Sequence, residues 1–132
     1  MAFAQFTADL HLEHALIDAQ HASLFVAVNQ LHDAMRAGDS REQLGEILAF
    51  LRKYTVEHFA TEESFMGETD FPEAAAHKAQ HDALVRQVQE LEAKHTAGSL
   101  TLSITVMTFL RDWLAQHIAV EDRKLARHLQ SR

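Results

Sequence analysis

Histidine is unusually frequent in this sequence, and five of the ten histidines recur at helical spacing among apolar residues. These five are His21, His58, His77, His81 and His117. A single histidine on an apolar helix face is usually a hydrogen-bonded core residue. Five in one core would leave many ring nitrogens without partners. A metal ion would satisfy them together, because each neutral imidazole offers a nitrogen lone pair.

Carboxylates accompany these histidines at spacings that place them on shared helix faces. His58 and Glu62 are four residues apart, and so are His77 and His81. Residues at this spacing project from one side of a helix. One such pair is a weak signal in a histidine-rich chain. Their occurrence on successive predicted helices indicates a shared metal site.

The carboxylate that would accompany His117 is ambiguous from spacing alone. Glu121 follows His117 by four residues and would lie on the same helix face. Asp122 follows by five, which places it about 140° around a regular helix. Glu121 is also well explained as a solvated surface carboxylate, so both residues stay candidates at this point.

The number and type of donors narrow the choice of metal. Five imidazoles and two carboxylates are too many for one tetrahedral zinc site. They suit two six-coordinate ions bridged by carboxylates. Calcium and magnesium would require more oxygen donors. Iron fits this donor set best, with manganese or zinc as alternatives.

Long helices must position these residues. With one proline and four glycines, the chain has few natural breaks, and these fall at Gly38–Ser40, Gly67–Pro72 and Ala97–Ser99. Ser40 and Gln43 form a capping-box pattern, and Pro72 suits the first turn of a helix. Short connections make neighbouring helices antiparallel. We therefore predict one all-α domain over residues 1–132, an up-down-up-down four-helix bundle with an irregular N-terminal arm over 1–17 and helices over roughly 18–37, 41–65, 72–96 and 100–128.

Composition excludes several other classes of protein. The net charge of −7 disfavours nucleic acid and anionic lipid as partners. The absence of cysteine excludes disulfides and thiolate metal sites. No apolar run reaches the length of a membrane span, and the N-terminus does not resemble a signal peptide, so we expect a cytoplasmic protein. No strong apolar stripe for self-association is evident, so we expect a monomer.

Over nearly its whole length the sequence resembles hemerythrin in its bacterial single-domain form. The matching segments are Ile17–His21, Tyr54–Met66, Phe71–His81 and Trp113–Asp122. All seven positions of the family's ligand pattern carry the expected residue types, and the last of them is Asp122 rather than Glu121. Since Asp122 would face away from His117 in a regular helix, we predict a local widening such as a π-bulge near residues 118–121, or a last helix aligned so that both of its flanks reach the metals.

The resemblance implies two iron ions, Fe2+ or Fe3+, joined by an oxo or hydroxo bridge and by Glu62 and Asp122. It assigns His77, His81 and His117 to one iron. It assigns His21 and His58 to the other, whose open position would bind dioxygen. It also implies an apolar oxygen pocket, in which a dry environment slows loss of oxygen as peroxide. The matching pocket residues are Leu24, Phe59, Trp113, Leu114 and Ile118.

Other residues depart from the family pattern or match no ligand position. The arm carries Phe3 and Phe6 where the family usually has a tryptophan, and the usual tyrosine before the proline is Phe71. We predict that His14 is an arm residue; the alternative is a proton donor near the site entrance. Glu63 is predicted to lie at the surface or to contact a ligand. The remaining histidines are predicted to lie on the surface or in the arm: His11, His32, His95 and His128.

The function implied is reversible dioxygen binding for carriage, storage or delivery, with an oxygen-using enzyme as a candidate partner. Oxygen-activating di-iron enzymes in four-helix bundles use mostly carboxylates with Glu-x-x-His pairs. That motif is missing at the ligand positions here, so we expect a protein that is not an enzyme. The alternatives are an oxygen or redox sensor for a signalling partner and, less well supported, a redox enzyme acting on peroxide or nitric oxide.

Overall fold

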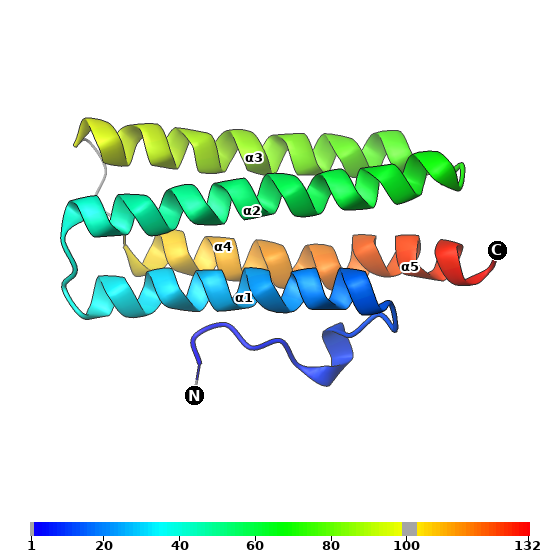
Figure 1. The fold of residues 1–132 in the computed structure, drawn as a ribbon, viewed down its shortest axis with the longest axis horizontal. Coiled ribbons are helices and arrows are strands. Elements are labelled where there is room, and N and C mark those ends of the chain that lie inside the picture. Colours follow the sequence, from blue (N-terminus) through cyan, green and yellow to red (C-terminus); the bar gives the residue numbers. More distant parts are fainter. Residues whose placement is uncertain (1, 99–102) are drawn as a thin grey trace.

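Long antiparallel helices make up most of the chain (Figure 1). The structure, a computed structural model, describes residues 2–98 and 103–132. Its elements are the 3-10 turn η1 (Ala8–Leu10), α1 (Ala15–Arg36), α2 (Arg41–Glu68), α3 (Ala74–Ala97), α4 (Ile104–His117), the π-helical segment η2 (Ile118–Asp122) and α5 (Arg123–Gln130). Because α4, η2 and α5 follow one another without a break, they form one rod. The predicted all-α four-helix bundle is therefore confirmed.

Serine side chains cap the starts of two of the helices. Ser40 accepts a hydrogen bond from the Gln43 backbone N–H at 3.1 Å, and the Ser40 N–H donates to the Gln43 side chain at 3.0 Å. This reciprocal pair is the capping box expected at the start of α2. Ser103 caps α4 by accepting from the Val106 N–H at 3.3 Å. The predicted start of this helix at residue 100 lies outside the described residues.

The first helix begins at Ala15 rather than at Asp18 because His14 caps it. The His14 ring nitrogen Nδ1 accepts a hydrogen bond from the Ile17 N–H at 3.2 Å. Asp18 instead ties the arm to the first turn, accepting from the backbone N–H of Leu12 at 2.9 Å and of His14 at 3.3 Å. An imidazole cap is less common than a Ser, Thr, Asp or Asn cap, which is why residue type gave no sign of it.

The corner between α2 and α3 also differs from the prediction. Helix α2 continues through Gly67 to Glu68, and α3 begins only at Ala74. Asp70 does not cap a helix; its backbone takes a positive φ of 53° and reverses the chain. Pro72 therefore precedes the helix. Met66, Phe71 and Leu125 pack together in a small core that holds this corner.

The bundle consists of four rods: α1, α2, α3 and the continuous α4–η2–α5. The core runs the length of the bundle between them. Helix α2 packs against α1 and α3, and α1 also packs against α4. Fully buried apolar side chains mark the core from end to end, and among them are Ile17, Leu31, Leu48, Met107 and Leu125. A layer of polar side chains crosses this core and is described below. Among the described residues, no helix combines the length and apolarity that a membrane span requires.

The N-terminal arm lies along the outside of the bundle beside α1 (Figure 1). The Asn29 side chain holds it at Ala4, accepting from the Ala4 N–H at 2.7 Å and donating to the Ala4 carbonyl at 2.8 Å. Further along, the Gln130 side chain donates to the Leu12 carbonyl at 3.0 Å, and the Arg123 guanidinium donates to the Asp9 carbonyl. Hydrogen bonds thus hold the arm against the bundle near its start and near its end.

Candidate metal centre

The seven predicted ligand side chains meet in one layer across the bundle. Helix α1 supplies His21, α2 supplies His58 and Glu62, α3 supplies His77 and His81, and the last rod supplies His117 and Asp122. Each of the seven is at most 4% exposed. So many ionisable groups are rarely buried together unless they are paired or bind a metal.

The carboxylate of Glu62 directs its two oxygens at different histidines. Its Oε1 lies 3.1 Å from His81 Nε2 and 3.4 Å from His77 Nε2. Its Oε2 lies 3.2 Å from His58 Nε2 and 3.4 Å from His21 Nε2. Glu62 therefore stands between two groups of imidazoles, with one oxygen for each.

Asp122, on the last rod, likewise directs its two oxygens at different histidines. Its Oδ1 lies 3.0 Å from His77 Nε2 and 3.1 Å from His117 Nε2, whereas its Oδ2 lies 3.0 Å from His21 Nε2. The ligand atoms thus form two sets that share both carboxylates, with the atoms of each set within 4.8 Å of one another. One set contains three histidines and the other contains two. This is the arrangement required by two ions that are bridged by two carboxylates.

The π-helical segment η2 explains how Asp122 reaches the layer. A π-turn closes over five residues instead of four, so it brings the fifth residue after His117 back to the inner face. Asp122 is 1% exposed, whereas the Glu121 side chain is 23% exposed and lies 3.8 Å from Lys124. The predicted π-bulge is confirmed, and Glu121 lies outside the ligand layer.

Outer hydrogen bonds fix the orientation of three of the imidazoles. In each, the ring nitrogen Nδ1 faces a side-chain oxygen: His58 faces Gln20 at 2.7 Å, His81 faces Glu63 at 3.1 Å, and His117 faces Gln80 at 3.1 Å. An oxygen acceptor requires the proton on Nδ1. The lone pair of each neutral ring is then on Nε2, which points into the layer.

Several buried atoms test whether these residues fit a metal. His21 Nε2, His58 Nε2, Glu62 Oε2 and both Asp122 oxygens are buried and, within the described residues, have no hydrogen-bond partner. The Nε2 atoms of His81 and His117 lie only 3.2 Å apart. Since both rings donate from Nδ1, their lone pairs face each other, and a shared cation would turn this repulsion into coordination. The donor atoms therefore fit a pair of metal ions.

The protonation of the layer supports the same interpretation. Burial lowers the pKa of His21 and of His77, but the Asp122 and Glu62 carboxylates outweigh it and raise each pKa to about 9. Burial raises the pKa of both carboxyls, yet the surrounding histidines hold the pKa of Glu62 and of Asp122 below the usual range. The negative charges of the two buried carboxylates thus require compensating positive charge. Metal ions can supply it in place of protons on the histidines.

A small apolar cavity lies one helical turn from the ligand layer. Its volume is about 30 Å³, large enough to admit a molecule the size of water. Its wall is formed by residues of all four rods: Leu24, Val28, Leu51, Thr55, Phe59, Leu84, Val88, Leu110 and Leu114. The only polar group in this wall is the Thr55 hydroxyl, which donates to the Leu51 carbonyl at 2.7 Å.

Three of the five predicted pocket residues line this cavity, namely Leu24, Phe59 and Leu114. Trp113 does not. Its ring stacks on His117, with centroids 4.6 Å apart and planes inclined by 11°, beside a separate hollow at the surface. Ile118 is fully buried within η2 but is not part of the wall.

Sequence reasoning missed Gln20 and Gln80 as partners of the ligands. Each directly precedes a ligand histidine in the chain but supports a ligand on another helix, as Glu63 does after Glu62. The sequence offered one sign of this role, because each of these residues is adjacent to a predicted ligand. Residue type alone could not show which imidazole each would reach, because that depends on helix packing.

Outside the layer, His14 and His11 are accounted for by the arm. His14 caps α1 and packs edge-on against Phe65, with ring centroids 5.1 Å apart. His14 therefore has a structural role as an arm residue, as predicted, and it caps α1. His11 is exposed and stacks on Phe6 at 4.5 Å.

Two further histidines were wrongly predicted to lie on the surface. His32 is 7% exposed because Phe3 of the arm stacks over it at 4.0 Å. His95 is 4% exposed and donates to the Arg41 carbonyl at 2.7 Å, while the Arg41 guanidinium donates back to the His95 carbonyl. Both are buried by contacts between segments distant in sequence, which helical periodicity does not reveal.

Comparisons with known proteins agree with this geometry. The sequence pattern of the hemerythrin HHE cation binding domain matches residues 13–129. The bacteriohemerythrin of Methylococcus capsulatus is 40% identical over 106 residues, which cover 80% of this chain and 80% of that protein. That of Ralstonia nicotianae is 32% identical and covers 100% of this chain and 93% of its own. A crystal structure of wild-type hemerythrin superposes with a TM-score of 0.91 at 36% identity, covering 97% of this chain and 98% of that one. The chain belongs to the hemerythrin family.

Proposed function

We propose that the protein binds dioxygen reversibly at a di-iron centre, for carriage, storage or delivery. The observation that carries this proposal is the unequal division of donors. His77, His81 and His117 would hold one ion and only His21 and His58 would hold the other, while Glu62 and Asp122 belong to both sets. The ion with fewer protein donors would keep a coordination position for a small ligand. A bound diferrous pair would supply the two electrons that reversible dioxygen binding requires.

The chain's own residues favour binding that is reversible. The apolar cavity excludes water from the region one turn from the ligands, since cavities lined in this way stay dry. Its one hydroxyl, on Thr55, has its proton engaged with the Leu51 carbonyl. The wall therefore offers no free proton donor that would help a reduced oxygen species to leave.

The same features support a carrier rather than an enzyme. Turnover of peroxide or nitric oxide would need a residue able to move protons at the reaction site. His14, the candidate for such a role, uses Nδ1 to cap α1. Five imidazole donors also differ from the carboxylate-rich sets of oxygen-activating di-iron bundles. We therefore expect little or no catalytic turnover.

A sensing role would need a segment that moves with the state of the metals. The arm is the natural candidate, since the Phe6 ring meets the His21 ring edge-on with centroids 6.4 Å apart. However, Asn29 holds the arm at Ala4 with two hydrogen bonds, and Asp18 and Gln130 hold it at Leu12. These attachments favour a fixed wall over a mobile reporter.

An optical experiment tests the proposed function. The protein is loaded with Fe2+ under argon, oxygen is admitted, and the visible spectrum is followed before and after a return to argon. We expect a charge-transfer band that forms with oxygen and disappears under argon over repeated cycles. Immediate oxidation without a lasting, reversible band would contradict the proposal.

A further inference from the structure

The ligand histidines differ in what their outer nitrogens contact. The Nδ1 of His81 faces a carboxylate oxygen of Glu63, whereas those of His58 and His117 face amide oxygens. The Nδ1 of His21 is buried and, within the described residues, has no hydrogen-bond partner. The only carboxylate among these outer partners thus supports the three-histidine set. The two-histidine set has one amide partner.

We propose that Glu63 is a positioning residue that makes the two ions unequal. Through His81 it strengthens the ion held by the three-histidine set, so that this ion is retained longer and oxidised more readily than its neighbour. The proposal rests on the di-iron function above and assigns a role to a residue outside the ligand layer.

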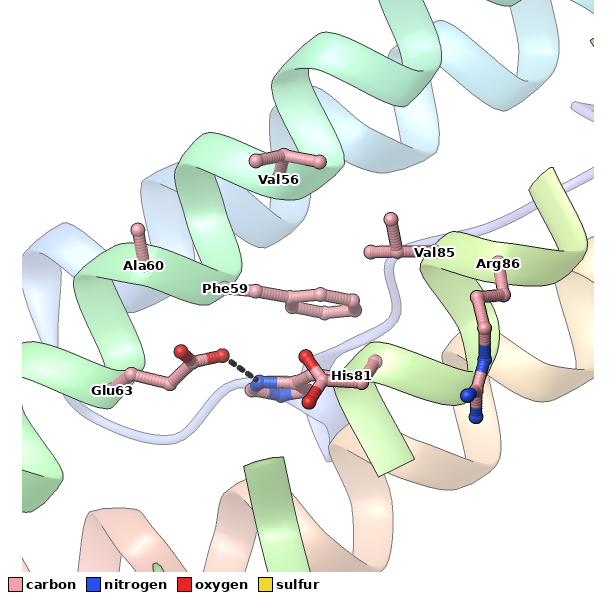
Figure 2. A pocket seen from close by; sticks show the side chains of 8 residues that line it. Val56, Phe59, Ala60, Glu63, His81, Val85 and Arg86 are labelled. Carbon is pink, nitrogen blue, oxygen red and sulfur yellow. Dashed lines mark hydrogen bonds and ion pairs between the residues drawn. The ribbon is translucent and has the colours of Figure 1, made fainter. Parts of the chain in front are cut away.

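Figure 2 shows how Glu63 and Phe59 together fix the His81 ring. The Glu63 carboxylate meets the edge of the ring at Nδ1, 3.1 Å away. Phe59 covers its face, with centroids 3.7 Å apart and planes within 2° of parallel. The imidazole cannot rotate without losing one of these contacts. Its Nε2 therefore stays directed at Glu62 Oε1, 3.1 Å away.

The neighbouring charges leave Glu63 available to His81. Lys78 lies 3.9 Å from Glu63 Oε1 but only 3.0 Å from Asp82, with which it forms a closer ion pair. The Glu63 oxygen that faces His81 is the other one, Oε2. Glu63 and Asp82 both line a hollow of about 320 Å³ between α2 and α3. Glu63 and Asp82 therefore share the same hollow, but of these two carboxylates only Glu63 contacts a predicted ligand, His81.

A carboxylate acceptor has a stronger effect on a ligand imidazole than an amide. It draws the Nδ1 proton toward itself, which makes the ring a more basic donor at Nε2. A more basic donor stabilises the more highly charged ion, so it favours Fe3+ over Fe2+. The effect should be greatest at the ion of His81 and smallest at the ion of His21.

The test follows iron release from the iron-loaded protein into excess chelator, together with a potentiometric titration. In the wild-type protein we expect two phases of release, the slower one from the three-histidine set. Glu63→Gln keeps an oxygen acceptor but removes the charge. We expect it to accelerate the slow phase about 10- to 100-fold, to leave the fast phase unchanged and to raise the potential of one ion.

Two matched variants separate this effect from general electrostatics. Asp82→Asn removes the same charge from the same hollow without touching His81, and should leave both phases unchanged. Gln20→Glu places a carboxylate on His58 and should slow the fast phase. Circular dichroism of each variant checks folding. Because Glu63 is partly exposed, with 27% of its side chain accessible, its replacement should not disturb the fold.

Unchanged release from Glu63→Gln, or equal acceleration by Asp82→Asn, would overturn the proposed role of Glu63. A wild-type protein that retains fewer than two irons would instead overturn the di-iron function on which the proposal rests.

Discussion

At the scale of single residues, Glu62 and Asp122 organise the centre. Each faces both sets of histidines, with a different oxygen toward each. Loss of either carboxylate would remove a donor from both ions at once. Truncation of a single histidine would affect only one ion directly.

The contrast between Asp122 and its neighbour gives the first prediction. Asp122→Ala should release at least one of the two irons, because it removes a shared donor. Glu121→Ala should retain both, because Glu121 lies outside the layer and contacts Lys124. Iron content per chain after desalting measures the difference. Equal iron content in the two variants would contradict the ligand assignment.

The raised pKa of His21 and of His77 makes the metal-free protein sensitive to pH. In the folded chain each pKa is about 9, against an ordinary value of 6.5. The stabilisation from these protons is therefore complete below pH 6.5 and is lost as the pH rises toward 9. Urea unfolding of the metal-free protein should show a lower free energy of unfolding at pH 9 than at pH 6.5.

The iron-loaded protein is the control for this effect. Bound iron replaces the protons, so its stability should not fall over the same interval. It should fall instead in acid, where ligands that must be deprotonated bind protons again. A metal-free protein that is equally stable at both pH values would refute the charge balance described for the layer.

At the scale of elements, η2 determines which carboxylate of the last rod reaches the ligand layer. A π-turn behaves as one extra residue within an α-helix. Removal of Val120, whose side chain is 46% exposed, should restore regular α-helix and place the aspartate four residues after His117. We expect this deletion variant to keep two irons per chain.

Deletion of Gln116 is the matched control on the same rod. It would rotate His117 by about 100° relative to the preceding core residues, and should abolish binding at the three-histidine set. Iron content and helical circular dichroism report both results. Loss of iron from the Val120 deletion variant would show that iron binding requires the widened turn itself. It would then not be enough for the aspartate to lie on the inner face of the helix.

The sequence contained enough information for the bundle and for the meeting of the seven side chains. Periodicity places His77 and His81 on one face, and three further helices bring their own histidines to the same depth. Asp122 needed the family resemblance, because regular helical geometry favours Glu121. The cap formed by His14 and the burial of His95 were missed, because they depend on contacts that local pattern does not encode.

The cavity illustrates the same limit. Its wall residues lie about one and two turns from the ligands on every rod, for example Leu24 and Val28 after His21. That register could be extended from the ligand positions. The outward placement of Trp113 against His117 could not, because a tryptophan at that position is compatible with either face of the rod until the helices are packed.

At the scale of the whole molecule, we expect the dry core around the ligand layer to govern how long bound oxygen survives. Leu114→Asn would bring a polar group and water into the cavity wall, and should accelerate irreversible oxidation several-fold. Leu114→Met, which nearly conserves volume and polarity, should have little effect. The decay of the oxygenated spectrum measures both. Equal decay in the two variants would show that the cavity does not protect the site.

We propose that one layer of the bundle holds two irons through shared carboxylates. Anomalous diffraction at the iron absorption edge, from crystals of the iron-loaded protein, tests it most directly. We predict two iron peaks between Glu62 and Asp122, one bound by His77, His81 and His117 and the other by His21 and His58. A single peak, or two peaks that do not share both carboxylates, would contradict the account.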